Sequence, residues 1–202
     1  MRKVYNLILL LFLISSCSNK QQQEQFARDS YPLKVGNWWR YQVVNFFGSQ
    51  STDTISLNVV SLVTSGSTTD YTCHLLKNGL VIDSGHFVQS DTALYYSGSN
   101  PYYSIFGFFN LKFPFVEGQK WAGTFPGDTI IAAGKAESFK VLGSTYAPVY
   151  SLARRFSIPQ NNLIQIIYLT PKVGVIYQSI NFRSDTAVWV QEAIHLIDYN
   201  LK

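Results

Sequence analysis

Apolar and polar residues alternate with a period of two along most of the chain. Ile55, Leu57 and Val59 alternate with polar neighbours, and residues 39–43 follow the same pattern. Because successive side chains of a strand point to opposite faces, this pattern predicts half-buried β-strands. Beyond the N-terminal region, no segment keeps a helical period over three turns. Further strands are expected near residues 91–97, 102–109, 119–125, 128–133, 136–143, 147–157, 162–170, 173–182 and 186–199.

A tight hairpin is predicted at Asn78-Gly79, between a strand over residues 72–77 and another over 80–88. A two-residue loop would fix the register of the two strands. The expected pairs are Lys77 with Leu80, His74 with Asp83, and His86 with Tyr71. His74 and His86 then lie on opposite faces and cannot easily share a zinc ion.

The segment from Leu163 to Leu169 is apolar on both faces. Such a strand is either covered on both sides or faces an apolar cavity on one side. Many short strands at close spacing, with no helices between them, favour an antiparallel fold. We therefore expect an all-β domain: one curved antiparallel sheet that forms a half-barrel or a barrel.

The spacing Pro-x3-Gly-x2-Trp occurs twice in the chain. Proline keeps the chain extended, glycine permits a sharp turn, and tryptophan begins a strand with a large apolar anchor. Convergent turn chemistry and a duplicated half-sheet both explain two such matches, and we favour the duplication. The matching residues are Pro32, Gly36 and Trp39, and then Pro114, Gly118 and Trp121.

The N-terminus has the three regions of a secretory signal. Met1-Arg2-Lys3 is basic, residues 4–14 are apolar except for Asn6, and Ser15, Ser16 and Cys17 follow. The apolar run is shorter than the roughly 20 residues that span a bilayer. We expect residues 1–16 to be a signal peptide, residues 17–30 a flexible polar tether, and residues 31–202 a single β domain.

Ile14-Ser15-Ser16-Cys17 resembles the lipobox of bacterial lipoproteins. The resemblance implies that Cys17 is acylated and becomes the first residue of the mature chain. Stable anchoring takes more than one acyl chain, and this modification supplies more than one. Because Ser18 is not an aspartate, the resemblance favours the outer membrane, with the domain facing either the periplasm or the exterior.

A second resemblance covers the two ends of the domain. Residues 31–41 (YPLKVGNWWRY) and 168–177 (YLTPKVGVIY) are similar to segments of uncharacterised envelope lipoproteins of Gram-negative bacteria. The resemblance implies a curved antiparallel sheet, broadly like lipoprotein-carrier and lipocalin-like shapes, and brings no catalytic residues. The chain departs from the pattern at Lys172, where a glycine is expected.

Composition narrows the function classes. The chain is 47% hydrophobic, 15% aromatic and 14% charged, which argues against disorder and coiled coils. The formal charge is +4, and no basic run exceeds Arg154-Arg155, so nucleic acid is not an expected partner. Two cysteines and three histidines leave little room for a metal site, and no cofactor is expected. With Cys17 acylated, Cys73 has no disulfide partner and is expected to be buried.

The search for catalytic residues gives no convincing site. Asp83-Ser84-Gly85-His86 holds the right residue types, but in a strand Asp83 points away from Ser84 and His86. His195, in the last expected strand, is more typical of a packed residue than of a ligand. We therefore expect a protein that is not an enzyme.

Residues 95–115 hold nine aromatic side chains. Because strand side chains alternate, some of them must face away from the main core. An exposed apolar patch usually binds a ligand, a partner or a membrane. The candidate ligand-binding residues are Tyr102, Tyr103, Phe106, Phe108, Phe109 and Tyr168.

Three function classes remain open. The first, which we favour, is an envelope lipoprotein that binds an apolar or amphipathic ligand, such as a lipid, on its concave face. The second is a structural or assembly module that contacts another envelope protein through the same aromatic residues. The third is a hydrolase that uses His86 or His195 as its base, and we rank it last.

Overall fold

The computed structural model describes residues 31–46, 50–97, 110–123, 128–158, 161–183 and 188–202, and the regular elements in these ranges are all β-strands. No helix in the described ranges is long and apolar enough to cross a membrane. The strands are β1 (Trp38–Asn45), β2 (Ser51–Ser65), β3 (Thr68–Lys77), β4 (Leu80–Gln89), β5 (Ala93–Ser97), β6 (Asn110–Lys112), β7 (Lys120–Ala122), β8 (Thr129–Ala136), β9 (Phe139–Val141), β10 (Ser144–Tyr146), β11 (Val149–Ile158), β12 (Asn161–Thr170), β13 (Gly174–Arg183) and β14 (Val188–Asn200).

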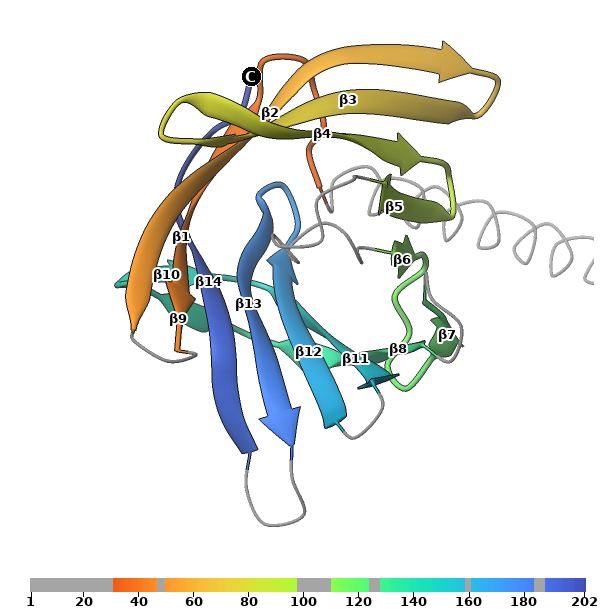
Figure 1. Ribbon diagram of the computed structural model, residues 1–202. Helices are drawn as coiled ribbons and strands as arrows, with labels where there is room; N and C mark the ends of the chain where they lie inside the picture. The colour runs from red at the N-terminus through yellow and green to blue at the C-terminus, as the bar shows by residue number, and fades with distance from the viewer. Residues whose placement is uncertain (1–30, 47–49, 98–109, 124–127, 159–160, 184–187) are drawn as a thin grey trace, which may run out of the picture.

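Twelve of the strands form one antiparallel sheet in the order β6-β5-β4-β3-β2-β1-β14-β13-β12-β11-β8-β7. Strands β9 and β10 form a separate hairpin. The large sheet curves until its two end strands, β6 and β7, come close to each other, so the sheet is a nearly closed barrel (Figure 1). The predicted fold class, an all-β domain with one curved antiparallel sheet, is confirmed.

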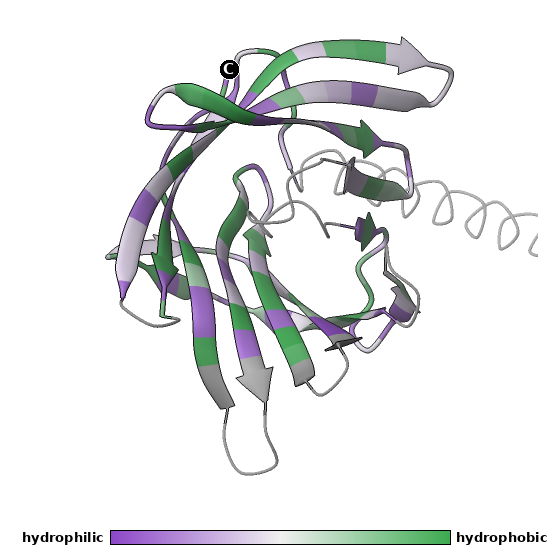
Figure 2. Ribbon diagram, viewed as in Figure 1, coloured by the Kyte–Doolittle hydropathy of each residue, from purple (hydrophilic) through white to green (hydrophobic). Residues whose placement is uncertain are grey.

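The inner face of the sheet carries the hydrophobic core. On β1 and β2, the inward residues Trp39, Tyr41, Ile55 and Leu57 are completely buried, as their period-two spacing predicts. Apolar and polar bands follow one another along the strands (Figure 2). Burial of these large side chains is the main favourable term in folding, at about 25 cal/mol for each Å² of apolar surface.

An aromatic cluster fills one end of the barrel. It consists of Tyr31, Trp39, Phe87 and Tyr96. The Tyr31 ring lies 4.7 Å from Trp39 and 5.2 Å from Phe87, and Phe87 lies 4.9 Å from Tyr96. These centroid distances are typical of favourable aromatic pairs. The cluster links the segment before β1 to β4 and β5.

The two Pro-x3-Gly-x2-Trp motifs build the same turn. Gly36 and Gly118 both have positive φ, at 87° and 80°. Gly36 donates its backbone N–H to Val59, and Gly118 donates in the same way to Ala132. In each motif, the residue after the glycine donates its backbone N–H to the carbonyl of the residue two positions before the glycine, which closes a turn. The carbonyl of that same donor residue accepts a hydrogen bond from the neighbouring strand.

The motifs also stand at equivalent places in the sheet. The first leads into β1, the start of a run of six neighbouring strands that ends at β6. The second leads into β7, the start of a second run of six that ends at β14, with the β9–β10 hairpin inserted. This arrangement supports the duplicated half-sheet that the sequence favours.

The register predicted for the β3–β4 hairpin is correct only next to its turn. Lys77 pairs with Leu80, as expected. At the step from Leu75 to Leu76 there is a β-bulge, in which β4 has one extra residue without a partner on β3. The pairing beyond this bulge is therefore shifted by one residue. The observed pairs are Leu75 with Asp83, His74 with Ser84, and His86 with Thr72.

The strand predicted near residues 136–143 is also wrong. The chain turns at Leu142 and Gly143, which have φ values of 47° and 95°. Two consecutive residues of positive φ make a tight hairpin turn whose twist matches the flanking strands. The segment therefore forms the β9–β10 hairpin and not one continuous strand.

Candidate functional site

A polar groove opens at one end of the barrel, between the β2–β3 hairpin and the β4–β5 turn. Its volume is about 460 Å³, within the roughly 300–1,000 Å³ that ligand sites span. Sheet register explains its position: Thr64 pairs with Thr69, and Thr69 pairs with Gln89. Three neighbouring strands therefore place a row of polar side chains along one wall.

The groove is lined mostly by hydroxyl, amide and carboxylate groups. The Oγ1 atoms of Thr64 and Thr69 are 3.3 Å apart, a hydrogen bond across the β2–β3 ladder. Ser90 uses its hydroxyl within the turn, where it accepts from the backbone N–H of Ala93 at 3.1 Å. The side chains that line the groove include Thr64, Ser67, Thr69, Tyr71, Gln89 and Asp91.

Tyr71 is the one aromatic side chain among the residues that line the groove. Tyr71 lines the groove and also packs against the hydrophobic core. It pairs with Phe87, which pairs with Tyr96, so the next row of the sheet leads directly into the aromatic cluster. The polar side chains of the groove therefore lie next to the buried aromatic cluster.

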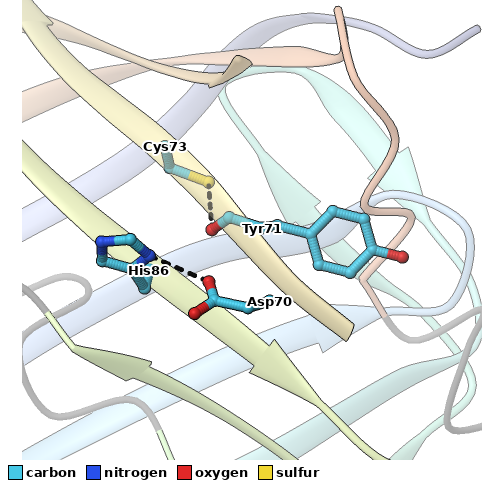
Figure 3. A network of polar contacts seen from close by, with 4 residues as sticks. All are labelled: Asp70, Tyr71, Cys73 and His86. Carbon is cyan, nitrogen blue, oxygen red and sulfur yellow. Dashed lines mark hydrogen bonds and ion pairs between the residues drawn. The ribbon is translucent and has the colours of Figure 1, made fainter. Parts of the chain in front are cut away.

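The opposite face of the same strands carries a polar contact. His86 Nδ1 lies 2.9 Å from Asp70 Oδ1, and both side chains are about half exposed. Figure 3 shows the Tyr71 ring directed away from this pair. His74 and His86 lie on one face, because their neighbours Cys73, Asp83 and Gly85 are buried on the other. The expectation that the two histidines occupy opposite faces is therefore wrong, and the bulge in β3–β4 is the reason.

Residues 83–86 do not converge as a catalytic triad. Asp83 is buried on the inner face, whereas Ser84 and His86 are exposed on the outer face, as the strand period predicts. Within the described residues, no group of three His, Cys, Asp or Glu side chains is placed to hold a metal ion.

Cys73 is a free thiol with no exposed surface, as predicted. Its sulfur lies 3.7 Å from the Tyr71 carbonyl (Figure 3). Burial raises the pKa of the thiol to about 12. At neutral pH the thiol is therefore protonated, and the thiolate is the nucleophilic form.

A buried polar layer lies on the inner face farther round the sheet. Asp128 and Arg154 form an ion pair in which each side chain is 2% exposed, and burial lowers the pKa of Arg154. Arg154 pairs with Gln165 on the next strand, and Gln178 lies on the strand beyond it. Hydrophilic bands cross β12 and β13 side by side in Figure 2. Sequence analysis missed this layer, although Gln165 stands out within the apolar segment 163–169.

Of the six predicted ligand-binding residues, only Tyr168 lies in the described part of the chain. Its ring stacks on Phe139 at 4.3 Å and lies 5.7 Å from Tyr177. Tyr168 therefore belongs to an aromatic group under the β9–β10 hairpin, on the face opposite Ile167. His195 lies 5.1 Å from Tyr177, and burial lowers its pKa, as suits a packed histidine. The predicted residues outside the described ranges are Cys17, Tyr102, Tyr103, Phe106, Phe108 and Phe109.

No family model matches this sequence, and no curated protein matches it. Two solved structures are similar. One, described as an exported protein with a YmcC-like fold from Bacteroides fragilis, has a TM-score of 0.53 and 11% identity, with 84% of this chain and 98% of that chain covered. The other, described as a lipoprotein from Parabacteroides distasonis, has a TM-score of 0.47 and 10% identity, with 84% and 97% covered. The first similarity shows that the chain has a YmcC-like fold.

Proposed function

We propose that this chain is a lipid-anchored envelope protein that binds an amphipathic ligand in the groove between the β2–β3 hairpin and the β4–β5 turn, and that it is not an enzyme. The observation that carries the proposal is the groove, in which polar side chains lie beside the ring of Tyr71, which also packs against the core. A surface with both chemistries side by side complements a ligand that has a polar and an apolar part. The dispersal of residues 83–86 over two faces supports binding over catalysis.

The proposed location rests on two supports. The lipobox at Cys17 implies acylation and anchoring, with the outer membrane favoured by Ser18. The protein of YmcC-like fold is described as exported. We propose that the domain is tethered to the membrane through residues 17–30 and faces either the periplasm or the exterior.

Native mass spectrometry of the full chain tests both parts of the proposal. The protein is expressed with its own signal and extracted in a detergent whose head group contains no sugar. The acyl groups on Cys17 add mass to both native and denatured spectra, and Cys17→Ser removes it. A non-covalent ligand adds mass to the native spectrum alone. A bare mass in every native preparation would overturn the ligand-binding proposal.

A second candidate function, an assembly module, is favoured by the projecting part of the β2–β3 hairpin. Strand β1 pairs with β2 only as far as Asn58, so in the described structure β2 beyond Val59 has a ladder partner on one side alone. Val63 is 69% exposed there, and Val60 and Leu62 are exposed as well. A bare strand edge with apolar side chains can accept a strand from a partner protein.

Site-specific crosslinking distinguishes this candidate. A photo-crosslinking residue at Val63 should give a discrete adduct in intact cells if the hairpin is an interface. The same residue at Leu80, which is 72% exposed at the β3–β4 turn, serves as the control. Equal labelling at both positions would count against an interface at the hairpin.

A further inference from the structure

Two exposed lysines lie together at the turn before β1. Asn37 joins them, because its backbone N–H donates to the Lys34 carbonyl at 2.9 Å and its Oδ1 accepts from the Lys202 backbone N–H at 2.8 Å. The Lys202 side chain also lies so close to Gly36 that a Cβ atom there would be 2.6 Å from Nζ. The C-terminus therefore lies against this turn (Figure 1).

A third exposed lysine, Lys172, comes from the turn between β12 and β13. The neighbouring carbonyl of Val173 accepts from the Trp39 indole at 2.6 Å, and Gly174 lies against the ring of Tyr31. These contacts hold the β12–β13 turn beside the first residues of the domain. Among the described residues, none of the three lysines has an ion-pair partner. We call them the basic patch: Lys34, Lys172 and Lys202.

The basic patch combines charge with exposed apolar surface. Val35 is 42% exposed beside Lys34, and Tyr199 is 39% exposed near the C-terminus. Asp198, the carboxylate nearest to Lys202 in the sequence, pairs with Arg40 at 3.9 Å. Lysines around exposed apolar side chains suit the surface of an anionic bilayer, which attracts the ammonium groups and accepts the apolar groups at its acyl boundary. The exposed carboxylates at this end of the barrel lie on other turns: Asp91, Glu117 and Glu137.

The tether and the groove lie at the same end of the barrel as the basic patch. The tether joins the domain at Tyr31, and the fourteen residues from Cys17 span at most about 50 Å. Alternate connections of an antiparallel sheet lie at one end. The turn before β1, the β2–β3 hairpin, the β4–β5 turn and the β12–β13 turn therefore share one end.

From these features we propose that the basic patch rests on an anionic lipid bilayer, so that the groove faces the lipid. The inference names the partner of this end of the barrel. It rests on the proposed function, because the anchor at Cys17 and the groove both belong to that function.

The test follows amide hydrogen exchange of the full chain in two kinds of nanodisc. One kind contains phosphatidylcholine alone, and the other contains equal parts of phosphatidylcholine and phosphatidylglycerol. We expect slower exchange of residues 33–37 and 171–174 in the anionic discs. The β3–β4 turn, at the opposite end, is the internal reference. Leu80 is 72% exposed there, but the nearby Lys77 pairs with Asp53 at 2.9 Å, so exchange of residues 78–81 should not change.

Single-charge variants test whether the lysines cause the protection. Lys34→Gln and Lys172→Gln should each lower the protection in anionic discs about fivefold, the factor by which one lysine strengthens binding to an anionic membrane. Arg155→Gln is the matched control and should leave the protection unchanged. Arg155 is exposed on β11, towards the opposite end of the barrel, where it pairs with Thr129 and Ile164.

The outcomes separate this inference from the proposed function. Equal exchange in the two discs, or an equal effect of Arg155→Gln, would overturn the inference, and a ligand in the native mass spectrum would leave ligand binding standing. A bare native mass with protection in anionic discs alone would overturn ligand binding and support the inference. If the denatured spectrum shows no acyl mass, co-sedimentation with vesicles of the same two compositions replaces the discs. Binding to neither vesicle would then overturn both the anchor and the inference.

Discussion

The side chain of Gln178 lies on the inner face of β13 with none of its surface exposed. Among the described residues, neither its Oε1 nor its Nε2 has a hydrogen-bond partner. An unsatisfied buried amide costs about 1–3 kcal/mol. Gln178→Leu should therefore raise the free energy of unfolding by an amount in this range, measured by urea denaturation.

Gln42→Leu is the control for this change, because Gln42 lies on β1 and is only partly buried. Its replacement should leave stability nearly unchanged. If Gln178→Leu instead destabilises the protein, the amide has a partner in solution, either an internal water or part of a ligand.

Lys172 is the position where the envelope-lipoprotein resemblance leads us to expect glycine. Its φ is 66°, in the left-handed region. A residue with a side chain loses about 1–2 kcal/mol of stability in this conformation. Glycine removes that strain, but its greater conformational entropy in the unfolded chain cancels about 0.4–1 kcal/mol of the gain. Lys172→Gly should thus stabilise the domain by about 0.5–1 kcal/mol in urea titrations.

Lys172→Ala separates conformation from charge. This variant removes the ammonium group but keeps the Cβ atom, so it should not stabilise the domain. Equal gains from alanine and glycine would show that backbone strain is not the cause.

At the scale of single elements, the sequence predicts the structure correctly where the conformational preferences of neighbouring residues determine it. Alternation located most strands, and the left-handed preference of Asn78-Gly79 fixed the turn between β3 and β4, with φ values of 52° and 78°. It failed at the bulge beside Leu75, because a bulge depends on packing across the whole sheet. It also failed at Leu142, because leucine gives no local signal for a positive φ.

The buried tyrosines of the core should make the stability of the protein depend on pH at the alkaline end. Burial is the main cause that raises the pKa values of Tyr31, Tyr41 and Tyr96 well above the ordinary 10.0. The unfolded chain therefore loses these protons at lower pH than the folded protein does. Stability is fully present below pH 10 and should fall as the pH rises above it.

Alkaline titration followed by tyrosinate absorbance and circular dichroism measures this effect. The buried tyrosines should ionise together with loss of β structure. Ionisation of all tyrosines with the β signal intact would contradict the prediction.

At the scale of the whole molecule, the candidate site shows why sequence reasoning stops short. Thr64, Thr69 and Gln89 lie on three different strands and carry no motif. They become one wall only through the pairing of β2 with β3 and of β3 with β4. The Asp128–Arg154 ion pair likewise cannot be recognised in the sequence, because its two members are 26 residues apart. The aromatic residues 102–109 attracted attention by composition, but composition alone does not place them.

The two runs of six strands meet at two seams of unequal strength. At one seam, β1 and β14 form a ladder that includes every residue of β1. At the other, β6 and β7 share no ladder in the described structure, and the Trp121 indole N–H instead donates to the Asn110 carbonyl at 3.0 Å. Such a seam has few backbone hydrogen bonds to break and is the weaker of the two.

Trp121→Phe should open the weak seam selectively, because it keeps a large ring but removes the indole N–H. Hydrogen exchange should become faster in residues 110–112 and 120–122 and stay unchanged in β1 and β14. Trp39→Phe is the matched variant at the other motif, where the indole N–H donates to the Val173 carbonyl at 2.6 Å. Because Trp39 is fully buried in the core, its loss should lower global stability by about 1 kcal/mol or more. Equal exchange rates at both seams in Trp121→Phe would show that the barrel is closed by something other than this hydrogen bond.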